Sequence, residues 1–177
     1  MATRSYIAMA LPNGKYKTIY CHSDGYLTHN GALLLDHYSD RAKVEELLAL
    51  GDISILAPNV HPTNKDHAFD YDKREEGVVV AYGRDRSEKN VDAKEFTYDE
   101  LVSEDSWTEY FYVFTQNDEW HYAHYSNKNL RPVKPGLDKE YEGLGFPRPK
   151  DFYGFFWEEQ AKELREEYQR KQQGEMS

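Results

Sequence analysis

Two strand-like segments, residues 5–11 and 16–22, flank the tripeptide Pro12-Asn13-Gly14, and this arrangement is the feature that most constrains the fold. Proline presets one turn position, and an Asn-Gly pair accepts the positive φ angles that a tight hairpin requires. The two segments are therefore predicted to form an antiparallel hairpin. A chain with this pattern is expected to build its core on a sheet.

A second hairpin is predicted between residues 107–115 and 119–125, on either side of Asn117-Asp118. Its strands are rich in aromatic side chains, and fifteen tyrosines help to raise the aromatic content of the 177-residue chain to 15%. Rings with polar tips suit half-buried strands. Because this hairpin contains no Lys or Arg, its rings are interpreted as core and not as a platform that stacks bases.

Between the hairpins the apolar residues adopt helical spacing. Residues 28–38 and 41–50 predict two short helices, the second capped by Asp40, and residues 52–56 are expected to add one more turn. The run 78–82 then predicts a buried strand, because most of its residues are β-branched. The pattern predicts a helical hairpin inserted between the second and third strands.

The remaining segments are dominated by loops. Residues 57–76 have no apolar period and are read as a long surface loop, a kind of segment that often carries function. Proline and glycine interrupt residues 127–149, which predicts a second loop-rich region. Residues 151–173 predict an amphipathic helix whose first half docks on the sheet, with residues 165–177 as a frayed tail.

These elements predict a single α+β domain over residues 1–177. We expect a curved antiparallel sheet of about five strands, with barrel-like closure as one option, an inserted helical hairpin and a C-terminal helix. A chain of this length can bury a sizeable core without disulfides.

The net charge of −10 disfavours direct binding to nucleic acid or to anionic lipid, because both require clustered Lys and Arg. From Glu95 to Asn127 the sequence contains no Lys or Arg at all. A solvated acidic face is the simpler interpretation, and a surface that copies the charge of nucleic acid to occupy a basic partner is the alternative. The candidate partner-binding residues are Glu95, Asp99, Glu100, Glu104 and Asp105.

Cysteine usage and hydropathy predict a cytoplasmic protein. Cys21 is the single cysteine, which excludes an internal disulfide, and residues 1–11 show no signal-peptide pattern. No apolar run approaches the roughly 20 residues that span a bilayer, so no membrane contact is expected. Oligomeric state cannot be inferred from the sequence.

The second strand leads into a polar cluster of His22, Asp24 and Tyr26, which is the first candidate ligand site. An aspartate near a histidine orients its ring, so His22 could act as a general acid or base if the strand extends to Asp24. The alternative is structural, with Asp24 in the turn between strand and helix. Cys21 and His22 are unsuited to act as a nucleophilic pair, because adjacent strand residues point to opposite faces.

The second candidate ligand site consists of Tyr82, Arg84 and Arg86, which would share one face if the strand continued through them. Two guanidinium groups and a ring suit a phosphate or carboxylate joined to a flat base. The alternative is ordinary surface ion pairing, which is the more natural interpretation for Arg86. If both clusters lie at the same end of the sheet, one pocket could contain His22 and Arg84.

The histidines do not indicate a metal site. The sequence lacks a pair of cysteines, a His-Glu-x-x-His motif and a calcium-loop pattern, and it also lacks a glycine-rich phosphate loop. His61 and His67 lie in the loop 57–76 and are interpreted as ordinary surface histidines. No metal and no cofactor is expected.

Three blocks of the sequence carry a resemblance: residues 4–7 with the motif Ile-Tyr-Cys-His-Ser-Asp-Gly-Tyr at residues 19–26, residues 43–54 and residues 79–86. Together they resemble a group of small proteins encoded by tailed phages and prophages, commonly labelled as uncharacterised or as having a small β-barrel like that of Src homology 3. The resemblance covers roughly the first half of the chain and implies an accessory phage protein that acts on host machinery or defence. It carries over no catalytic residue.

The leading hypothesis is a non-enzymatic, phage-encoded binding protein that inhibits or sequesters a host defence component in the bacterial cytoplasm. Its partner would be a host protein or a small nucleotide-like ligand. The alternative is a small enzyme acting on a nucleotide or phosphorylated metabolite, with His22 as acid-base and Arg84 as anion clamp.

Overall fold

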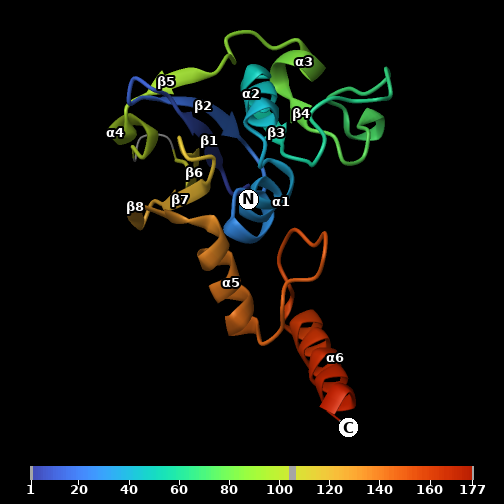
Figure 1. Ribbon diagram of the computed structural model, residues 1–177. Coiled ribbons are helices and arrows are strands. Elements are labelled where there is room, and N and C mark those ends of the chain that lie inside the picture. Colours follow the sequence, from blue (N-terminus) through green and yellow to red (C-terminus); the bar gives the residue numbers. More distant parts are fainter. Residues whose placement is uncertain (1, 104–106, 177) are drawn as a thin grey trace.

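The computed structural model describes residues 2–103 and 107–176. Its framework is an eight-stranded mixed sheet with the order β4-β3-β2-β1-β6-β7-β8, in which β5 also pairs with β2 (Figure 1). The strands are β1 Ser5–Ala10, β2 Tyr16–Cys21, β3 Ile53–Ile55, β4 Val80–Ala81, β5 Lys94–Phe96, β6 Tyr110–Phe114, β7 Trp120–His124 and β8 Asn127–Pro132. The helices are the π-helix η1 Leu27–Gly31, α1 Ala32–His37, α2 Arg41–Ala49, the 3-10 helix η2 Tyr71–Lys73, α3 Tyr82–Arg86, α4 Tyr98–Leu101, α5 Val133–Leu144 and α6 Glu158–Met176.

Both predicted hairpins are confirmed. Strands β1 and β2 pair antiparallel with Ile7 opposite Ile19, and β6 and β7 pair antiparallel with Tyr112 opposite Tyr122. The helical hairpin is also confirmed, with the Asp40 side chain accepting a hydrogen bond from the backbone N–H of Ala42 at the start of α2. Local turn and cap chemistry therefore acts as the sequence predicts.

The α+β class is confirmed, but the sheet has eight strands where about five were expected, it is mixed and not antiparallel, and the optional barrel-like closure is absent from the described residues. Strand β1 runs parallel to β6, which joins the two hairpins into one sheet, and β2 runs parallel to β3. The sheet stays open, since β4 and β8 end its order. Parallel neighbours need a long crossover connection, and the helices between β2 and β3 supply one.

Two short elements differ from expectation at the edge of the sheet. Residues 52–56, expected as a helical turn, contain strand β3 at Ile53–Ile55, and the predicted strand 78–82 shortens to β4 followed by helix α3. Because a helix and not a strand begins at Tyr82, the side chains of Tyr82, Arg84 and Arg86 do not alternate as the predicted ligand site assumed.

Residues 127–149 were predicted as loop, yet they form β8 and the twelve-residue helix α5. Pro135 lies in the first turn of α5, where backbone N–H groups have no partner within the helix, so the missing N–H is tolerated. Gly145 ends the helix in the left-handed conformation at φ 87°. The proline and glycine therefore mark the two ends of this helix.

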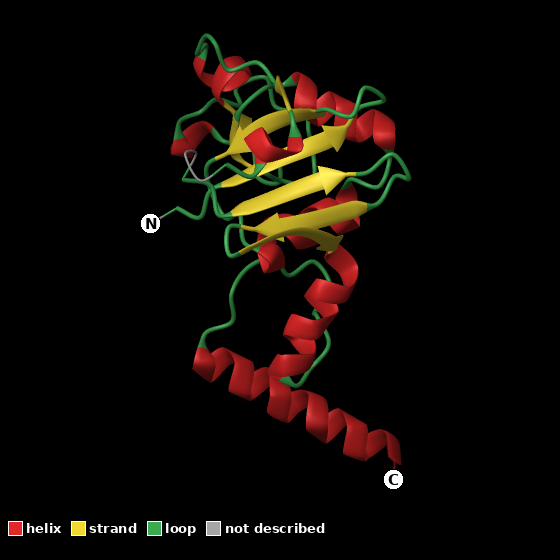
Figure 2. Cartoon of the chain, turned by 90° about the vertical axis from the view of Figure 1, so that its left-hand side faces the viewer, coloured by secondary structure: helices red, strands yellow, loops and turns green. Residues whose placement is uncertain are grey.

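Helix α6 also departs from the prediction. It begins at Glu158, after the aromatic cluster, and continues to Met176 through the segment expected to fray. It packs at the end of α5, where Arg165 Nε donates a 2.6 Å hydrogen bond to the carbonyl of Leu144, and not on the sheet. In Figure 2 both helices extend away from the strands.

The sheet buries apolar side chains on both faces. One core contains Ile7, Ile19, Tyr112 and Phe114 together with residues of α1, α2 and α5. A smaller core on the opposite face gathers Ala8, Phe111, Val113, Ala123 and residues of α4. Alternation along β1 and β6 sends successive side chains to the two cores. Within the parts of the chain described, no helix is long and apolar enough to cross a membrane.

Candidate functional site

In the structure His22 and Asp24 contact different partners and not each other. Strand β2 ends at Cys21, and Asp24 adopts a left-handed φ of 56°. His22 Nδ1 lies 2.8 Å from the Tyr20 hydroxyl, whereas a carboxylate oxygen of Asp24 lies 3.9 Å from His29 Nε2. Asp24 therefore has the structural turn position that was the alternative interpretation.

Cys21 is not placed for nucleophilic chemistry. Its side chain is buried, and burial raises the pKa of its thiol to about 11 despite hydrogen bonds from its surroundings. The thiol stays protonated at neutral pH, and only the thiolate is a strong nucleophile.

The second predicted cluster is divided by helix α3. Tyr82 and Arg86 are four residues apart and share a helix face, where both contact Phe69: the guanidinium of Arg86 lies 4.3 Å from the Phe69 ring centroid, and the two rings are 5.4 Å apart. Arg84 points to the other side. The expectation that all three side chains share one strand face is therefore wrong.

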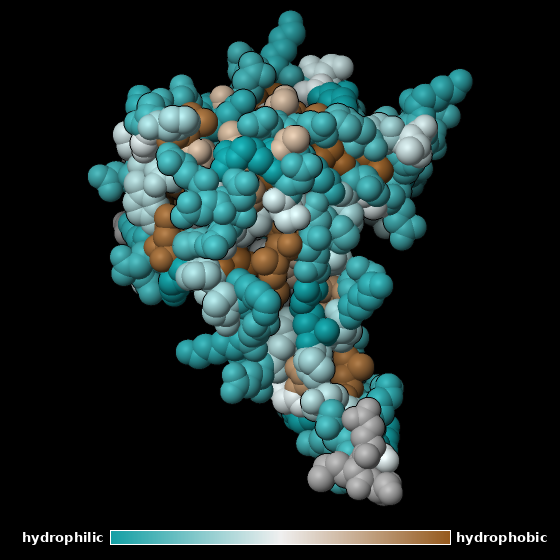
Figure 3. All heavy atoms as spheres, viewed as in Figure 1, coloured by the Kyte–Doolittle hydropathy of each residue, from teal (hydrophilic) through white to brown (hydrophobic). Residues whose placement is uncertain are grey.

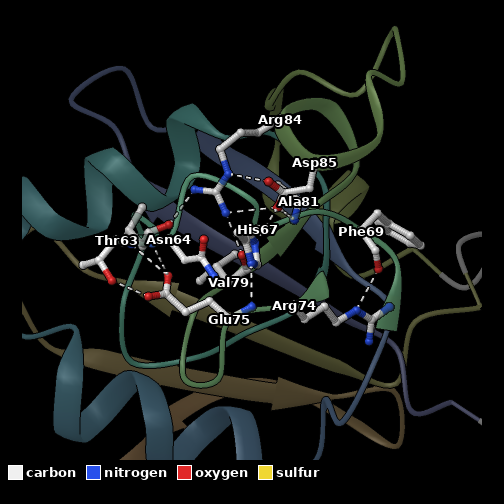
Figure 4. A network of polar contacts seen from close by, with 11 residues as sticks. Thr63, Asn64, His67, Phe69, Arg74, Glu75, Val79, Ala81, Arg84 and Asp85 are labelled. Carbon is white, nitrogen blue, oxygen red and sulfur yellow. Dashed lines mark hydrogen bonds and ion pairs between the residues drawn. The ribbon is translucent and has the colours of Figure 1, made fainter. Parts of the chain in front are cut away.

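Arg84 belongs to a buried polar network with His67 and Asp85 (Figure 4). Its guanidinium binds the Asp85 carboxylate through two hydrogen bonds of 2.9 and 3.0 Å. Two further hydrogen bonds of 2.6 Å go to the backbone carbonyls of Val60 and Val79. Because internal acceptors engage this guanidinium, it is poorly placed to serve as an anion clamp for an external ligand.

His67 completes the network from the long loop. Its side chain is 1% exposed, so its interpretation as an ordinary surface histidine is wrong. Nδ1 accepts a 2.8 Å hydrogen bond from the backbone N–H of Glu75, and Nε2 lies 3.3 Å from Asp85. Since Nδ1 is an acceptor, the proton resides on Nε2 and is donated to Asp85. The network therefore fastens loop 57–76 to α3.

Acid is expected to weaken this network. Burial alone would raise the pKa of Asp85, but hydrogen bonds from Arg84 and Ala81 and the charge of Arg84 bring it below its usual value. A lowered folded-state pKa stabilises the protein above the unfolded value of about 3.9, and the benefit disappears as the pH falls through the folded value. The free energy of unfolding, measured with urea from about pH 6 to pH 2, should fall in the wild type as Asp85 is protonated. In Asp85→Asn this pH-dependent part of the stability should be missing. A constant difference between the two across this range would contradict the assignment.

A cavity of about 320 Å³, here called the aromatic pocket, lies where the first helices meet the C-terminal part of the chain. Its walls come from η1 and the residue before it, from β6, from α5 and from the connecting segment 145–157. Its main lining residues are Tyr26, Tyr110, Glu140, Leu144, Phe155 and Phe156. Tyr26 is the predicted site residue that the structure places in this cavity.

Tyr26 is held in place on two sides. Its ring stacks on Phe155 with centroids 4.0 Å apart and an interplanar angle of 16°. Burial and the neighbouring Asp24, which hydrogen-bonds with the hydroxyl, raise the pKa of Tyr26 to about 12. The hydroxyl therefore stays protonated near neutral pH. Phe155 is 62% exposed. Figure 3 shows apolar groups near α5 and α6 on a mainly hydrophilic surface.

A tether fixes segment 145–157 beside the pocket. Arg148 donates a 2.8 Å hydrogen bond to Asp36, and the Tyr153 hydroxyl lies 2.7 Å from His37 Nε2 and 3.1 Å from Asp36. The backbone N–H of Gly154 donates to the carbonyl of Thr28 at 3.1 Å. These contacts join the end of α1 to the segment that carries Phe155.

The acidic residues of the segment 95–105 do not form a purely acidic surface in the fold. Glu95, Asp99 and Glu100 are exposed on β5 and α4, but Glu95 lies opposite Lys17 in the pairing of β5 with β2. Glu100 also closes a capping box with Thr97 at the start of α4. Glu104 and Asp105 lie outside the described residues.

Comparisons with known proteins identify no relative: no family model, no curated protein and no solved structure matches the chain. Over residues 2–103 and 107–176, no group of three or more His, Cys, Asp or Glu side chains is arranged to hold a metal ion.

Proposed function

We propose that this chain is a non-catalytic binding protein that holds a group of its partner in the aromatic pocket. The observation that carries the proposal is the pocket itself, which combines four aromatic rings with the carboxylate of Glu140. Small-ligand sites are mostly apolar concavities of roughly 300–1,000 Å³ with a few polar groups, and this pocket falls at the lower limit.

The resemblance to phage and prophage proteins supports a more specific version of this proposal. In that version the protein is phage-encoded, and its partner is a host defence component that it inhibits or sequesters. The nucleotide-directed enzyme receives less support, because Arg84 is bound by Asp85 and by two backbone carbonyls and the ring of His22 is engaged by the Tyr20 hydroxyl.

The proposal predicts that capture of a protein partner depends on Phe155. Tagged wild type and Phe155→Ala are incubated with a bacterial lysate, and a band that the wild type retains is quantified by mass spectrometry. We expect at least about a tenfold loss in Phe155→Ala, which corresponds to about 1.4 kcal/mol of binding energy. Tyr71→Ala, which removes another ring with 83% exposure, should retain the partner.

A double change, Glu95→Lys with Asp99→Lys, tests the acidic surface in the same assay. If this change abolishes capture while Phe155→Ala leaves it intact, charge mimicry replaces the pocket as the mode of binding. A nucleotide altered during incubation with the purified protein would instead favour the enzyme.

A further inference from the structure

We infer that the aromatic pocket binds an organic ammonium group. This inference rests on the proposed function and names the chemistry of the ligand. The group that decides it is Glu140, which comes from α5 and forms part of the pocket wall. Among the residues that the structure describes, no hydrogen-bond donor or cation pairs with its carboxylate.

Glu140 differs from two other charged residues of α5, which pair with each other. Lys134 and Asp138 form an ion pair of 2.8 Å, whereas Glu140, which lines the pocket, has no such partner among the described residues. Partial burial raises the pKa of Glu140, and its charge in turn helps to raise the pKa of Tyr110. A cation in the pocket would relieve both effects, because an opposite charge favours the ionised carboxylate.

The rest of the lining selects the kind of cation. Tyr26, Tyr110 and Phe155 contribute rings to the lining. The face of an aromatic ring carries negative potential and attracts ammonium groups, and the stacking of Tyr26 on Phe155 covers only one face of each. A hard metal ion such as Ca²⁺ requires six to eight oxygen ligands, and one carboxylate does not provide them. An alkylammonium ion combines a diffuse positive charge with apolar surface, so it matches both the rings and the carboxylate. The net charge of −10 also favours a cationic ligand.

The inference is tested by isothermal titration calorimetry of the full chain with choline and with its uncharged isostere 3,3-dimethylbutan-1-ol. Choline should bind at least about tenfold more tightly than the alcohol, because the two differ in charge and hardly in shape. Glu140→Gln should weaken choline binding by about tenfold and should leave the weak binding of the alcohol unchanged.

The matched control is Glu142→Gln. Glu142 lies two residues further along α5 and lines a different cavity, beside Tyr168, so its replacement removes the same charge outside the aromatic pocket. Choline binding should be unchanged in this variant. Equal loss in both variants would mean that overall charge governs binding, and equal affinity for choline and the alcohol would mean that the pocket is only apolar. Either result, or no choline binding at millimolar concentration, overturns the inference.

Competition distinguishes the source of the ammonium group. If it belongs to a lysine side chain of the protein partner, excess choline should release the partner captured by the wild type. If the natural ligand is a free small molecule, choline should bind while capture is unaffected. If capture of the partner depends on Phe155 but choline does not bind, the proposed function is supported and the inference of an ammonium ligand is wrong.

Discussion

Asp85→Ala is expected to lower the free energy of unfolding by about 3–5 kcal/mol, the cost of leaving a buried ionic partner without its counter-charge. The Asp85 side chain is only 3% exposed and accepts hydrogen bonds from Arg84 and from the backbone N–H of Ala81. Removing it leaves the Arg84 guanidinium without its counter-charge, and the Nε2–H of His67 and the backbone N–H of Ala81 without their acceptor. Denaturant unfolding followed by circular dichroism measures the effect.

The matched control is an ion pair between the last residue of α3 and Glu88, two residues beyond the helix. Arg86 and Glu88 form a 2.5 Å contact, but their side chains are 49% and 41% exposed. Breaking this pair with Glu88→Ala should cost about 0–1 kcal/mol, because solvent already screens it. If Asp85→Ala costs no more than Glu88→Ala, the network does not fasten the loop, and its geometry would have to be wrong.

Gly51→Ala is expected to destabilise the protein by more than about 3 kcal/mol, through backbone strain and a steric clash together. Gly51 has a φ of 76°, and a Cβ built there would lie 2.2 Å from the carbonyl oxygen of Val91. That oxygen cannot move away freely, because it accepts a 2.7 Å hydrogen bond from the backbone N–H of Asp52. Thermal unfolding gives the size of the effect.

Gly14→Ala separates the two contributions. Gly14 has a similar φ of 83°, but no atom lies within 4 Å of the Cβ that alanine would add. Its replacement should therefore cost only the conformational strain, about 1–2 kcal/mol. Similar losses for the two variants would show that residues around Val91 can shift, and that the close approach contributes little.

Local signals in the sequence predict local structure well. The Pro12-Asn13-Gly14 turn and the Asp40 cap act over a few residues, and both are present as expected. The pairing of β1 with β6 is a contact between residues about a hundred positions apart, such as Ile7 and Tyr112, and no short motif encodes it. The order and closure of the sheet were therefore beyond what hydrophobic periodicity can predict.

The candidate site also combines a residue that the sequence reveals locally with residues that only distant contacts bring together. Tyr26 stands out in the sequence beside a turn, whereas Glu140 and Phe155 reach the pocket only through the packing of distant segments. One available signal was missed. Pro147 and Pro149 precede the aromatic cluster 152–157, Gly154 interrupts it, and together they indicate a loop where residues 151–173 were predicted as a helix. His67 gives no such signal, because its burial depends on a loop folding over α3.

The tether formed by Asp36, Arg148 and Tyr153 holds segment 145–157 against α1. The pocket exists only while these two parts of the chain stay in contact. Docking of the segment and occupancy of the cavity are then thermodynamically coupled. A bound molecule would hold the segment closed, and any change that releases the segment would weaken binding without touching the cavity wall. Arg148 could in this way set affinity from outside the binding site.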